Sequence, residues 1–241
     1  MRILFIAGGS AATVFALAPL ATAARNAGHE VLMAANDDMS QVITNVGLPA
    51  VSVDSAGLSR YIYADRKGRP VDIPADPAAQ LPFTGTWFGR MAAAWLGPLL
   101  ELARGWRPDV VVGGTMIYAA PLLAAHLGVP NVRHTWDAVE VTEVDPGADQ
   151  ELAPELAALG LDRLPEPDLL LEVCPESLRP PVAPPARRTL PLRWISTNGQ
   201  RRLEPWMYRT GDRPLVCVTA GSRVCPRRRR SRTTGSARST S

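Results

Sequence analysis

The chain has 241 residues, 46% of them hydrophobic, so it can bury the core of one large domain or of one and a half. Its formal charge of +3 depends on six arginines after residue 225 (Arg227 to Arg230, Arg232 and Arg238), and the remaining chain is mildly acidic. An acidic body argues against a nucleic-acid-binding face, and three widely spaced cysteines fit neither a disulfide scaffold nor a zinc site.

The first element predicted is a strand over Arg2–Ala7, followed by a glycine turn at Gly8-Gly9. Ser10 then opens a helical pattern that stops at Gly28, which makes a βα unit. The N-terminal apolar run is too short for a signal peptide, and the apolar helix is too short to span a bilayer. We therefore expect a cytoplasmic protein without membrane contact.

Strands and helices continue to alternate along the chain. Strands are expected over 29–35, 50–54, 108–114, 129–136 and 167–175, helices over 37–49, 84–106, 118–128 and 149–160, and a long loop over 55–82. This alternation is typical of a doubly wound, Rossmann-like parallel sheet of the α/β class.

The composition divides the chain into four parts. Residues 1–178 form the α/β domain, and 179–213 form a proline-rich linker with a short helical turn. Residues 214–224 look like the first strand and glycine turn of a second α/β domain. The tail over 225–241 is rich in Arg and Ser without a hydrophobic period, so we expect it to be disordered.

Ligands of an open parallel sheet bind beyond the carboxyl ends of its strands. The stretch "AGGSAAT" after the first strand offers backbone N–H groups to an anion or a substrate, although Ser10 as a plain helix cap is an equal alternative. Asp37 and Asp38 after the second strand keep a weak dinucleotide-binding hypothesis open. Thr115 and Met116 follow the fourth strand at the same edge.

Asp137 follows the fifth strand next to Trp136, where partial desolvation would raise its pKa toward that of a useful base. A helix or turn cap is the plainer interpretation, and spacing alone favours it. Trp87, Phe88, Met91 and Trp95 recur at helical spacing, which fits core packing or an aromatic wall beside a ligand.

Several motifs carry a resemblance over residues 1–224, among them "HEVLMAAN", "DRKGRP", "TGTWFGRMAA", "WRPDVVVGGTM", "TWDA", "PGADQELAPELAALGL", "LEPWMY" and "VTAGSRV". They resemble the family 1 antibiotic glycosyltransferases, most of all the angucycline olivosyltransferases of the urdamycin and landomycin type. The resemblance implies a GT-B architecture, in which 1–178 hold the acceptor and a second domain holds a dTDP-deoxysugar donor.

The resemblance also implies roles for individual residues. Many members of the family carry a base histidine at the position of Thr13, oriented by an aspartate after the fourth strand, and "GGTM" here has no carboxylate. Asp137 is then the matching base, with Ser10 as its hydrogen-bond partner, as suits carbon–carbon bond formation on a phenolic ring. The acceptor-binding residues implied are Thr13, Trp87, Met91, Thr115, Met116 and Trp136, and the donor-binding residues are Thr219, Gly221, Ser222 and Arg223; no metal and no cofactor are expected.

The similarity to the family stops where a donor domain would begin, so we expect a truncated or frameshifted chain that is inactive alone. The predicted function is transfer of an olivose-type deoxysugar to an angucycline-type aglycone. The alternatives are a non-catalytic module that binds aromatic polyketides and, more weakly, a nucleotide-dependent oxidoreductase. The expected partners are an aromatic aglycone and the dTDP-sugar, with no specific nucleic acid and no membrane, and a homodimer is left open.

Overall fold

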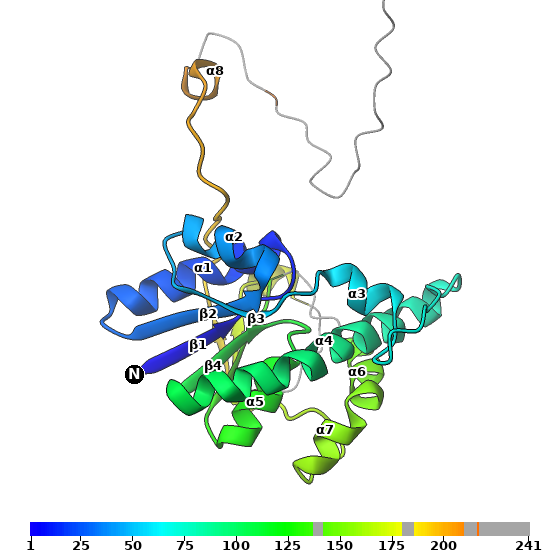
Figure 1. The fold of residues 1–241 in the computed structure, drawn as a ribbon. Helices are drawn as coiled ribbons and strands as arrows, with labels where there is room; N and C mark the ends of the chain where they lie inside the picture. Colours follow the sequence, from blue (N-terminus) through cyan, green and yellow to red (C-terminus); the bar gives the residue numbers. More distant parts are fainter. Residues whose placement is uncertain (137–141, 180–185, 210–215, 217–241) are drawn as a thin grey trace, which may run out of the picture. The chain divides into compact units, whose positions relative to one another are not determined.

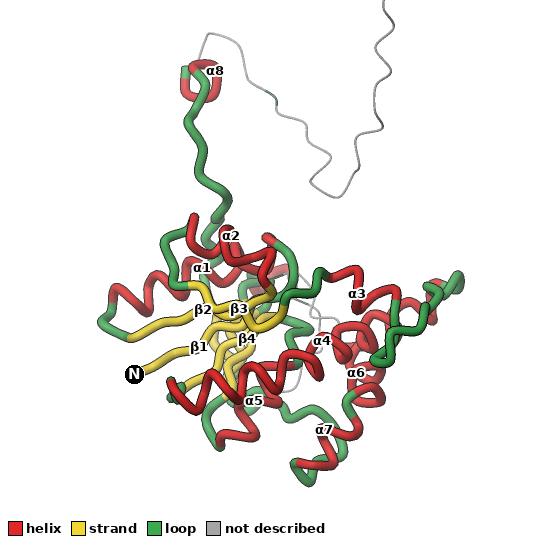
Figure 2. The backbone as a smooth tube through the Cα atoms, viewed as in Figure 1, coloured by secondary structure: helices red, strands yellow, loops and turns green. Residues whose placement is uncertain are grey.

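The computed structural model describes residues 1–136, 142–179, 186–209 and 216. Two compact units are present, over Met1–Gln200 and Arg201–Ser241, and we describe each by itself. The first unit contains a parallel sheet between layers of helices (Figures 1 and 2). This is the α/β class that the sequence predicts.

Among the described residues, seven parallel strands form one sheet in the order β3-β2-β1-β4-β5-β6-β7. The strands are β1 Arg2–Ile6, β2 Glu30–Asn36, β3 Ala50–Asp54, β4 Val110–Gly114, β5 Asn131–His134, β6 Leu169–Glu172 and β7 Thr189–Pro191. The order reverses at β1, which lies between β2 and β4. This is the point at which an open parallel sheet leaves a crevice for a ligand.

Helices cover both faces of this sheet, with α1 and α2 on one side and α4 and α5 on the other (Figure 1). The helices of the first unit are α1 Ala11–Asn26, η1 Asp37–Met39, α2 Ser40–Asn45, α3 Leu58–Tyr63, α4 Pro77–Gly105, α5 Ala119–Leu127, η2 Thr142–Val144, α6 Asp145–Glu151, α7 Ala153–Ala158 and η3 Glu176–Leu178. Strand β1 shows why both faces are covered. Leu4 and Ile6 pack into the α4 and α5 core, while Ile3 and Phe5 pack into the α1 and α2 core.

The segment over 55–82 differs from the expected long loop. It contains helix α3 and the first turns of α4, which begins at Pro77 because the Asp76 carboxylate accepts a hydrogen bond from the Ala78 N–H and Pro occupies the first helical position. Its middle forms a hairpin, in which the Val71 N–H donates to the Tyr63 carbonyl at 2.9 Å. The shortness of α3 hid it from a periodicity argument.

The segment expected as a linker also contributes to the sheet. Residues Thr189–Pro191 form β7, which pairs in parallel with β6, as in Leu171 opposite Leu190. Proline-rich sequence predicts an extended chain, but it cannot show that the extended chain joins a sheet edge. Within 179–213, residues 180–185 and 210–213 lie outside the described residues.

The second unit holds helix α8, Pro205–Tyr208, where the sequence predicts a helical turn. Its side chains Trp206, Met207 and Tyr208 are exposed. The predicted strand and turn over 214–224, apart from Val216, and the tail over 225–241 lie outside the described residues. None of the described helices is both long enough and apolar enough to cross a membrane.

Candidate functional site

The turn after β1 lies against the turn after β4. A Cβ atom built on Gly8 would come within 2.9 Å of the Ile117 side chain, and one built on Gly9 would come within 2.6 Å of Leu58 in α3. A larger residue at either position would require the Ile117 or the Leu58 side chain to shift. The glycine pair therefore joins three elements at the carboxyl edge of the sheet, where the sequence predicts a ligand.

The turn after β4 is strained. Met116 has a φ of 62°, in the left-handed region that side chains with a Cβ rarely adopt, while Thr115 before it is buried. The turn closes through the Ile117 N–H, which donates to the Gly114 carbonyl at 3.1 Å. Such strain often accompanies a functional turn, and Met116 keeps the partial exposure that acceptor contact requires, whereas Thr115 does not.

Trp136, after β5, covers the end of β4. A Cβ atom on Gly114 would lie 2.1 Å from the Trp136 ring, so the indole packs directly on the glycine backbone. Ser10, Thr115, Met116 and Trp136 thus come from three adjacent strand ends. The sheet order brings together residues that are more than 100 positions apart in sequence.

The hydroxyl groups of Ser10 and Thr13 differ in their hydrogen bonds. Ser10 occupies the N-cap position of α1, but its hydroxyl makes no capping hydrogen bond. The Thr13 hydroxyl instead bonds to two backbone carbonyls, those of Ser10 at 2.7 Å and Gly8 at 3.0 Å. The alternative in which Ser10 caps the helix is therefore confirmed for its position but not for its side chain, and the Thr13 hydroxyl proton is directed to backbone carbonyls of the turn.

The aromatic helix α4 packs mainly into the core. Met91 and Trp95 are almost fully buried, so Met91 is a packing residue in this structure and has no surface to offer an acceptor. Trp87 is half-buried and stacks on Phe88, with ring centroids 3.7 Å apart. Of this set, Trp87 alone keeps the exposure that contact with a ligand requires.

Behind this edge lies a buried polar cluster at the end of β3. The Asp54 carboxylate accepts hydrogen bonds from the Tyr61 hydroxyl and from the Trp95 Nε1–H, the latter at 3.1 Å. Burial first, and then the hydrogen bond and charge of Asp54, raise the pKa of Tyr61 well above its ordinary value. The cluster fixes α3 and α4 to the sheet.

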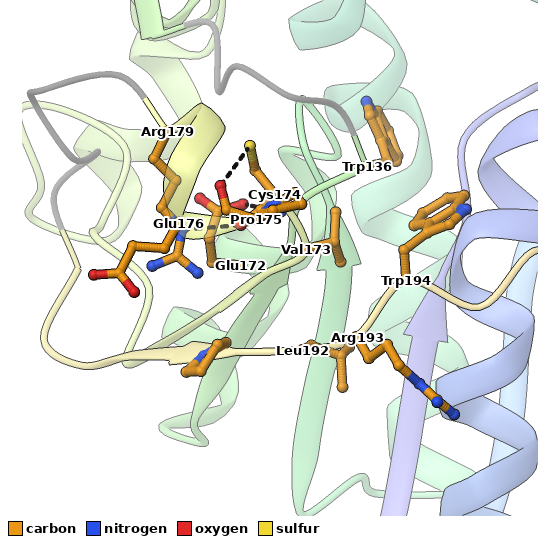
Figure 3. Close-up of a pocket in the computed structure, with 11 residues that line it drawn as sticks. Trp136, Glu172, Val173, Cys174, Pro175, Glu176, Arg179, Leu192, Arg193 and Trp194 are labelled. Carbon is orange, nitrogen blue, oxygen red and sulfur yellow. Dashed lines mark hydrogen bonds between the residues drawn. The ribbon is translucent and has the colours of Figure 1, made fainter.

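A cavity of about 730 Å³ lies over the ends of β5, β6 and β7. Its lining, drawn in Figure 3, comprises Trp136, Glu172, Val173, Cys174, Pro175, Glu176, Arg179, Pro191, Leu192, Arg193 and Trp194. Its volume is in the range of cavities that enclose a small organic ligand. Trp136, which packs on Gly114, connects it to the end of β4.

Sequence reasoning missed most of this lining. The acid that ends the sixth strand in "LLLEVCP" was an available signal, because a carboxylate beyond a buried strand is unusual. Trp194 and Arg193 gave no such signal, because they follow β7, whose place in the sheet the proline-rich sequence does not show.

Two of the predicted groups of site residues cannot be placed. Asp137 lies outside the described residues, and so do Thr219, Gly221, Ser222 and Arg223. His134 on β5 is 3% exposed, and burial lowers its pKa, so it is a neutral packed histidine. In the part of the chain that the structure describes, no three His, Cys, Asp or Glu side chains gather as metal ligands do.

The model of the erythromycin biosynthesis protein CIII-like N-terminal domain matches residues 83–221. The chain belongs to this family. The same residues include most of α4, the turn after β4, Trp136 and the whole lining of the cavity.

The relatives are named sugar transferases. An L-demethylnoviosyl transferase of Streptomyces niveus is 32% identical over 231 residues, which cover 95% of this chain and 58% of that protein. A tylactone mycaminosyltransferase of Streptomyces fradiae is 29% identical, over 92% of this chain and 57% of the relative. The chain thus spans less than two thirds of the length of these relatives.

A solved structure that superposes on this chain is also a glycosyltransferase. SsfS6, a glycosyltransferase of Streptomyces sp. SF2575 crystallised with thymidine diphosphate, superposes with a TM-score of 0.85 at 35% identity, over 93% of this chain and 62% of SsfS6. The chain has the α/β architecture of the N-terminal half of such GT-B glycosyltransferases. The family assignment removes the support for the oxidoreductase hypothesis.

Proposed function

We propose that this chain is the acceptor-binding part of a glycosyltransferase of antibiotic biosynthesis that takes its sugar from a TDP-deoxysugar. The observation that carries the proposal is the cavity at the carboxyl edge of the sheet, in a chain of this family. Relatives named as sugar transferases and the thymidine diphosphate complex of SsfS6 support the donor class.

The lining of the cavity favours a flat aromatic acceptor. Trp136 and Trp194 both line it, and the aliphatic side chains of Val173 and Leu192 add apolar wall (Figure 3). Indole rings bind planar rings by stacking, with little loss of side-chain freedom. We propose an aromatic polyketide of the angucycline type as acceptor and an olivose-type sugar as donor group, on the strength of the sequence resemblance.

The chemistry proposed for the complete enzyme is an inverting displacement. The acceptor attacks the anomeric carbon as the bond to the diphosphate breaks, and the acceptor proton passes to the carboxylate of Asp137. The commitment of the Thr13 hydroxyl to backbone carbonyls leaves no base at that position. Ser10, without a capping bond, is free to orient Asp137 or the acceptor, and formation of a carbon–carbon bond on a phenolic ring suits so weak a base.

Fusion of residues 1–200 to the segment of SsfS6 that follows the position equivalent to Gln200 tests the proposal. With TDP-olivose and a hydroxylated aromatic polyketide, mass spectrometry should detect a glycoside. The unfused chain should bind the acceptor without transferring sugar. A fusion that binds donor and acceptor but makes no product would favour the binding-module alternative.

In the active fusion, Asp137→Asn should lower turnover about 10²–10⁴-fold, because the amide cannot accept the acceptor proton. Acceptor affinity should change little, and Ser10→Ala should cost less. Full activity of the Asp137→Asn fusion would place the base elsewhere. Circular dichroism of the variant separates loss of a base from loss of a structural cap.

A further inference from the structure

Glu172 is a buried acid whose position is unusual. It ends β6, its residue exposure is 8%, and it lines the cavity. A carboxylate loses much of its hydration in such a place, so it needs hydrogen-bond donors to remain there. Those donors come from both neighbouring strand ends.

One carboxylate oxygen of Glu172 is fully engaged. Its Oε1 accepts a hydrogen bond from the Thr135 hydroxyl at 3.0 Å and another from the Cys174 N–H at 2.8 Å. The Thr135 Oγ1 in turn accepts from the Val173 N–H at 3.0 Å. The network ties β5 to β6 and fixes the direction of the carboxylate.

The second oxygen, Oε2, receives no hydrogen bond from any described residue, and it is not among the buried polar atoms that lack a partner. It is therefore the oxygen that meets the cavity, in the lining that Trp136 and Trp194 share (Figure 3). Proteins commonly use a rigidly held hydrogen-bond acceptor beside aromatic side chains to select a ring that carries a hydrogen-bond donor.

We propose that Glu172 determines the specificity of this cavity, its Oε2 accepting a hydrogen bond from a hydroxyl group on a flat aromatic ligand. The proposal rests on the proposed function, since it assigns this cavity to the acceptor. It selects for rings with a free hydroxyl and against rings on which that hydroxyl is blocked. A buried carboxylate that loses a hydrogen-bond donor raises the free energy of the complex. The chain should therefore bind a ring with a free hydroxyl about 10–100-fold more tightly than one with a blocked hydroxyl.

The same lining contains other charges. Arg179 donates from Nε to the Cys174 carbonyl at 2.9 Å, while Arg193 and Glu176 are exposed. An anionic ligand would bind preferentially to the arginines, whereas a ligand with a neutral hydroxyl group would donate a hydrogen bond to Glu172. The two cases call for different probes.

Equilibrium dialysis of the chain against three naphthalenes distinguishes them. The probes are 2-naphthol, its methyl ether 2-methoxynaphthalene, and 2-naphthoate. The wild-type chain should bind 2-naphthol about 10-fold or more tightly than the ether. This ratio requires no variant, so it tests the proposal even if a substituted chain misfolds.

Glu172→Gln should abolish the preference. The amide oxygen keeps the bonds from Thr135 and Cys174, but its NH₂ group now faces the cavity and can donate to the oxygen of either probe. The ratio of the affinities for 2-naphthol and its ether should therefore fall about 10-fold or more, to near 1. Glu101→Gln is the control, because Glu101 has a side chain 69% exposed on α4 and lies outside the lining of the cavity, and it should keep the wild-type ratio.

The binding results distinguish a failure of the role proposed for Glu172 from a failure of the proposed function. Equal binding of 2-naphthol and its ether by the wild-type chain would overturn the role of Glu172 and leave the aromatic cavity of the proposed function standing. Preferred binding of 2-naphthoate, lost in Arg179→Gln, would transfer the specificity to the arginines and also overturn it. If no naphthalene binds, both proposals fail.

Discussion

Tyr61 shows how a single hydroxyl holds the third strand to the helices around it. Its hydroxyl donates to the Asp54 carboxylate, and the folded chain keeps the hydroxyl proton to higher pH than the unfolded chain because the pKa of Tyr61 is raised. Because the folded-state pKa lies above the unfolded value of 10.0, the contribution of Tyr61 to the free energy of unfolding is fully present below about pH 10. It is lost as the pH rises, since only the unfolded state ionises.

We therefore predict that Tyr61→Phe lowers the free energy of unfolding at pH 7 by about 1–3 kcal/mol, because Asp54 loses a buried donor. The variant should also lose part of the decline in stability that the wild-type chain shows above pH 10. Urea unfolding between pH 7 and 11 measures both. Tyr63→Phe, at a residue 55% exposed, is the control and should change neither. A parallel decline in wild type and Tyr61→Phe would contradict the assigned pKa.

At the residue scale, sequence could predict which side chains stand at strand ends, but not their hydrogen bonds. Ser10, Thr115, Met116 and Trp136 were identifiable, because the carboxyl ends of parallel strands share one edge. The burial of Met91 was not, since helical spacing fits a core face and a ligand wall equally well. The bonds of Thr13 depend on the turn geometry that Gly8 permits.

At the scale of the elements, the close crossing of helices α4 and α6 depends on two glycines. A Cβ atom on Gly85 would lie 1.7 Å from the Val144 carbonyl oxygen, and one on Gly147 would lie 1.8 Å from that of Pro82. These are backbone atoms, so a side-chain rotation cannot relieve the clash. The helices approach each other closely because neither carries a side chain there.

We predict that Gly85→Ala and Gly147→Ala each destabilise the fold by about 1–3 kcal/mol or more, because the helices must separate. Gly105→Ala is the matched control on α4, since nothing lies within 4 Å of its added Cβ, and it should stay within about 1 kcal/mol of the wild type. Thermal unfolding of the three variants measures the difference. Equal stability of all three would show that the crossing is looser than the structure has it.

Arg66 fastens the hairpin between α3 and α4 to the neighbouring helices. Its guanidinium donates to the Glu151 carboxylate of α6 at 2.7 Å and to the Glu155 carboxylate of α7 at 2.7 Å and 3.0 Å. Two carboxylates on one guanidinium make a planar set of charge-assisted bonds. Within the hairpin at residues 63–71 the bonds are short-range, such as the Asp65 N–H to the Arg69 carbonyl at 2.9 Å, and Arg90 of α4 adds a longer-range bond from Nη1 to the Ala64 carbonyl at 3.3 Å.

Removal of this guanidinium in Arg66→Ala should raise hydrogen exchange of the hairpin amides about 10-fold or more, with a much smaller change in the core strands. Arg69→Ala is the control, because Arg69 is 73% exposed at its side chain and, among the described residues, forms its ion pair with Asp65 of its own turn. Exchange rates that rise as much in the control would assign the effect to the turn and not to the connection with α6 and α7.

The element scale also explains which parts of the fold were predictable. Long apolar runs such as the strand before Gly113 or the helix after Ser10 carry a clear period, and the structure confirms them. Helix α3 and strand β7 are too short to show one. Both are stabilised by tertiary contacts, α3 through Tyr61 and β7 through its pairing with β6, and such contacts leave no local pattern.

At the scale of the whole molecule, the compact unit ends at Gln200. The two hydrophobic cores and the lining of the cavity all lie before that residue. The side chains of Leu203, Trp206, Met207 and Tyr208 are between 47% and 59% exposed, so they bury little apolar surface. Folding and ligand binding are thus assigned to residues 1–200.

A chain that ends at Gln200 should therefore unfold within about 2 °C of the full chain and should bind 2-naphthol with the same affinity. A chain that ends at Leu178 is the comparison, because it lacks β7 and with it the Trp194 side of the cavity. That shorter chain exposes the edge of β6, so it should melt at a clearly lower temperature and lose affinity for the naphthalene. Calorimetry and dialysis of the three chains measure both effects. If the chain ending at Gln200 is as unstable as the shorter one, residues after 200 contribute to the fold, and the compact unit extends beyond Gln200.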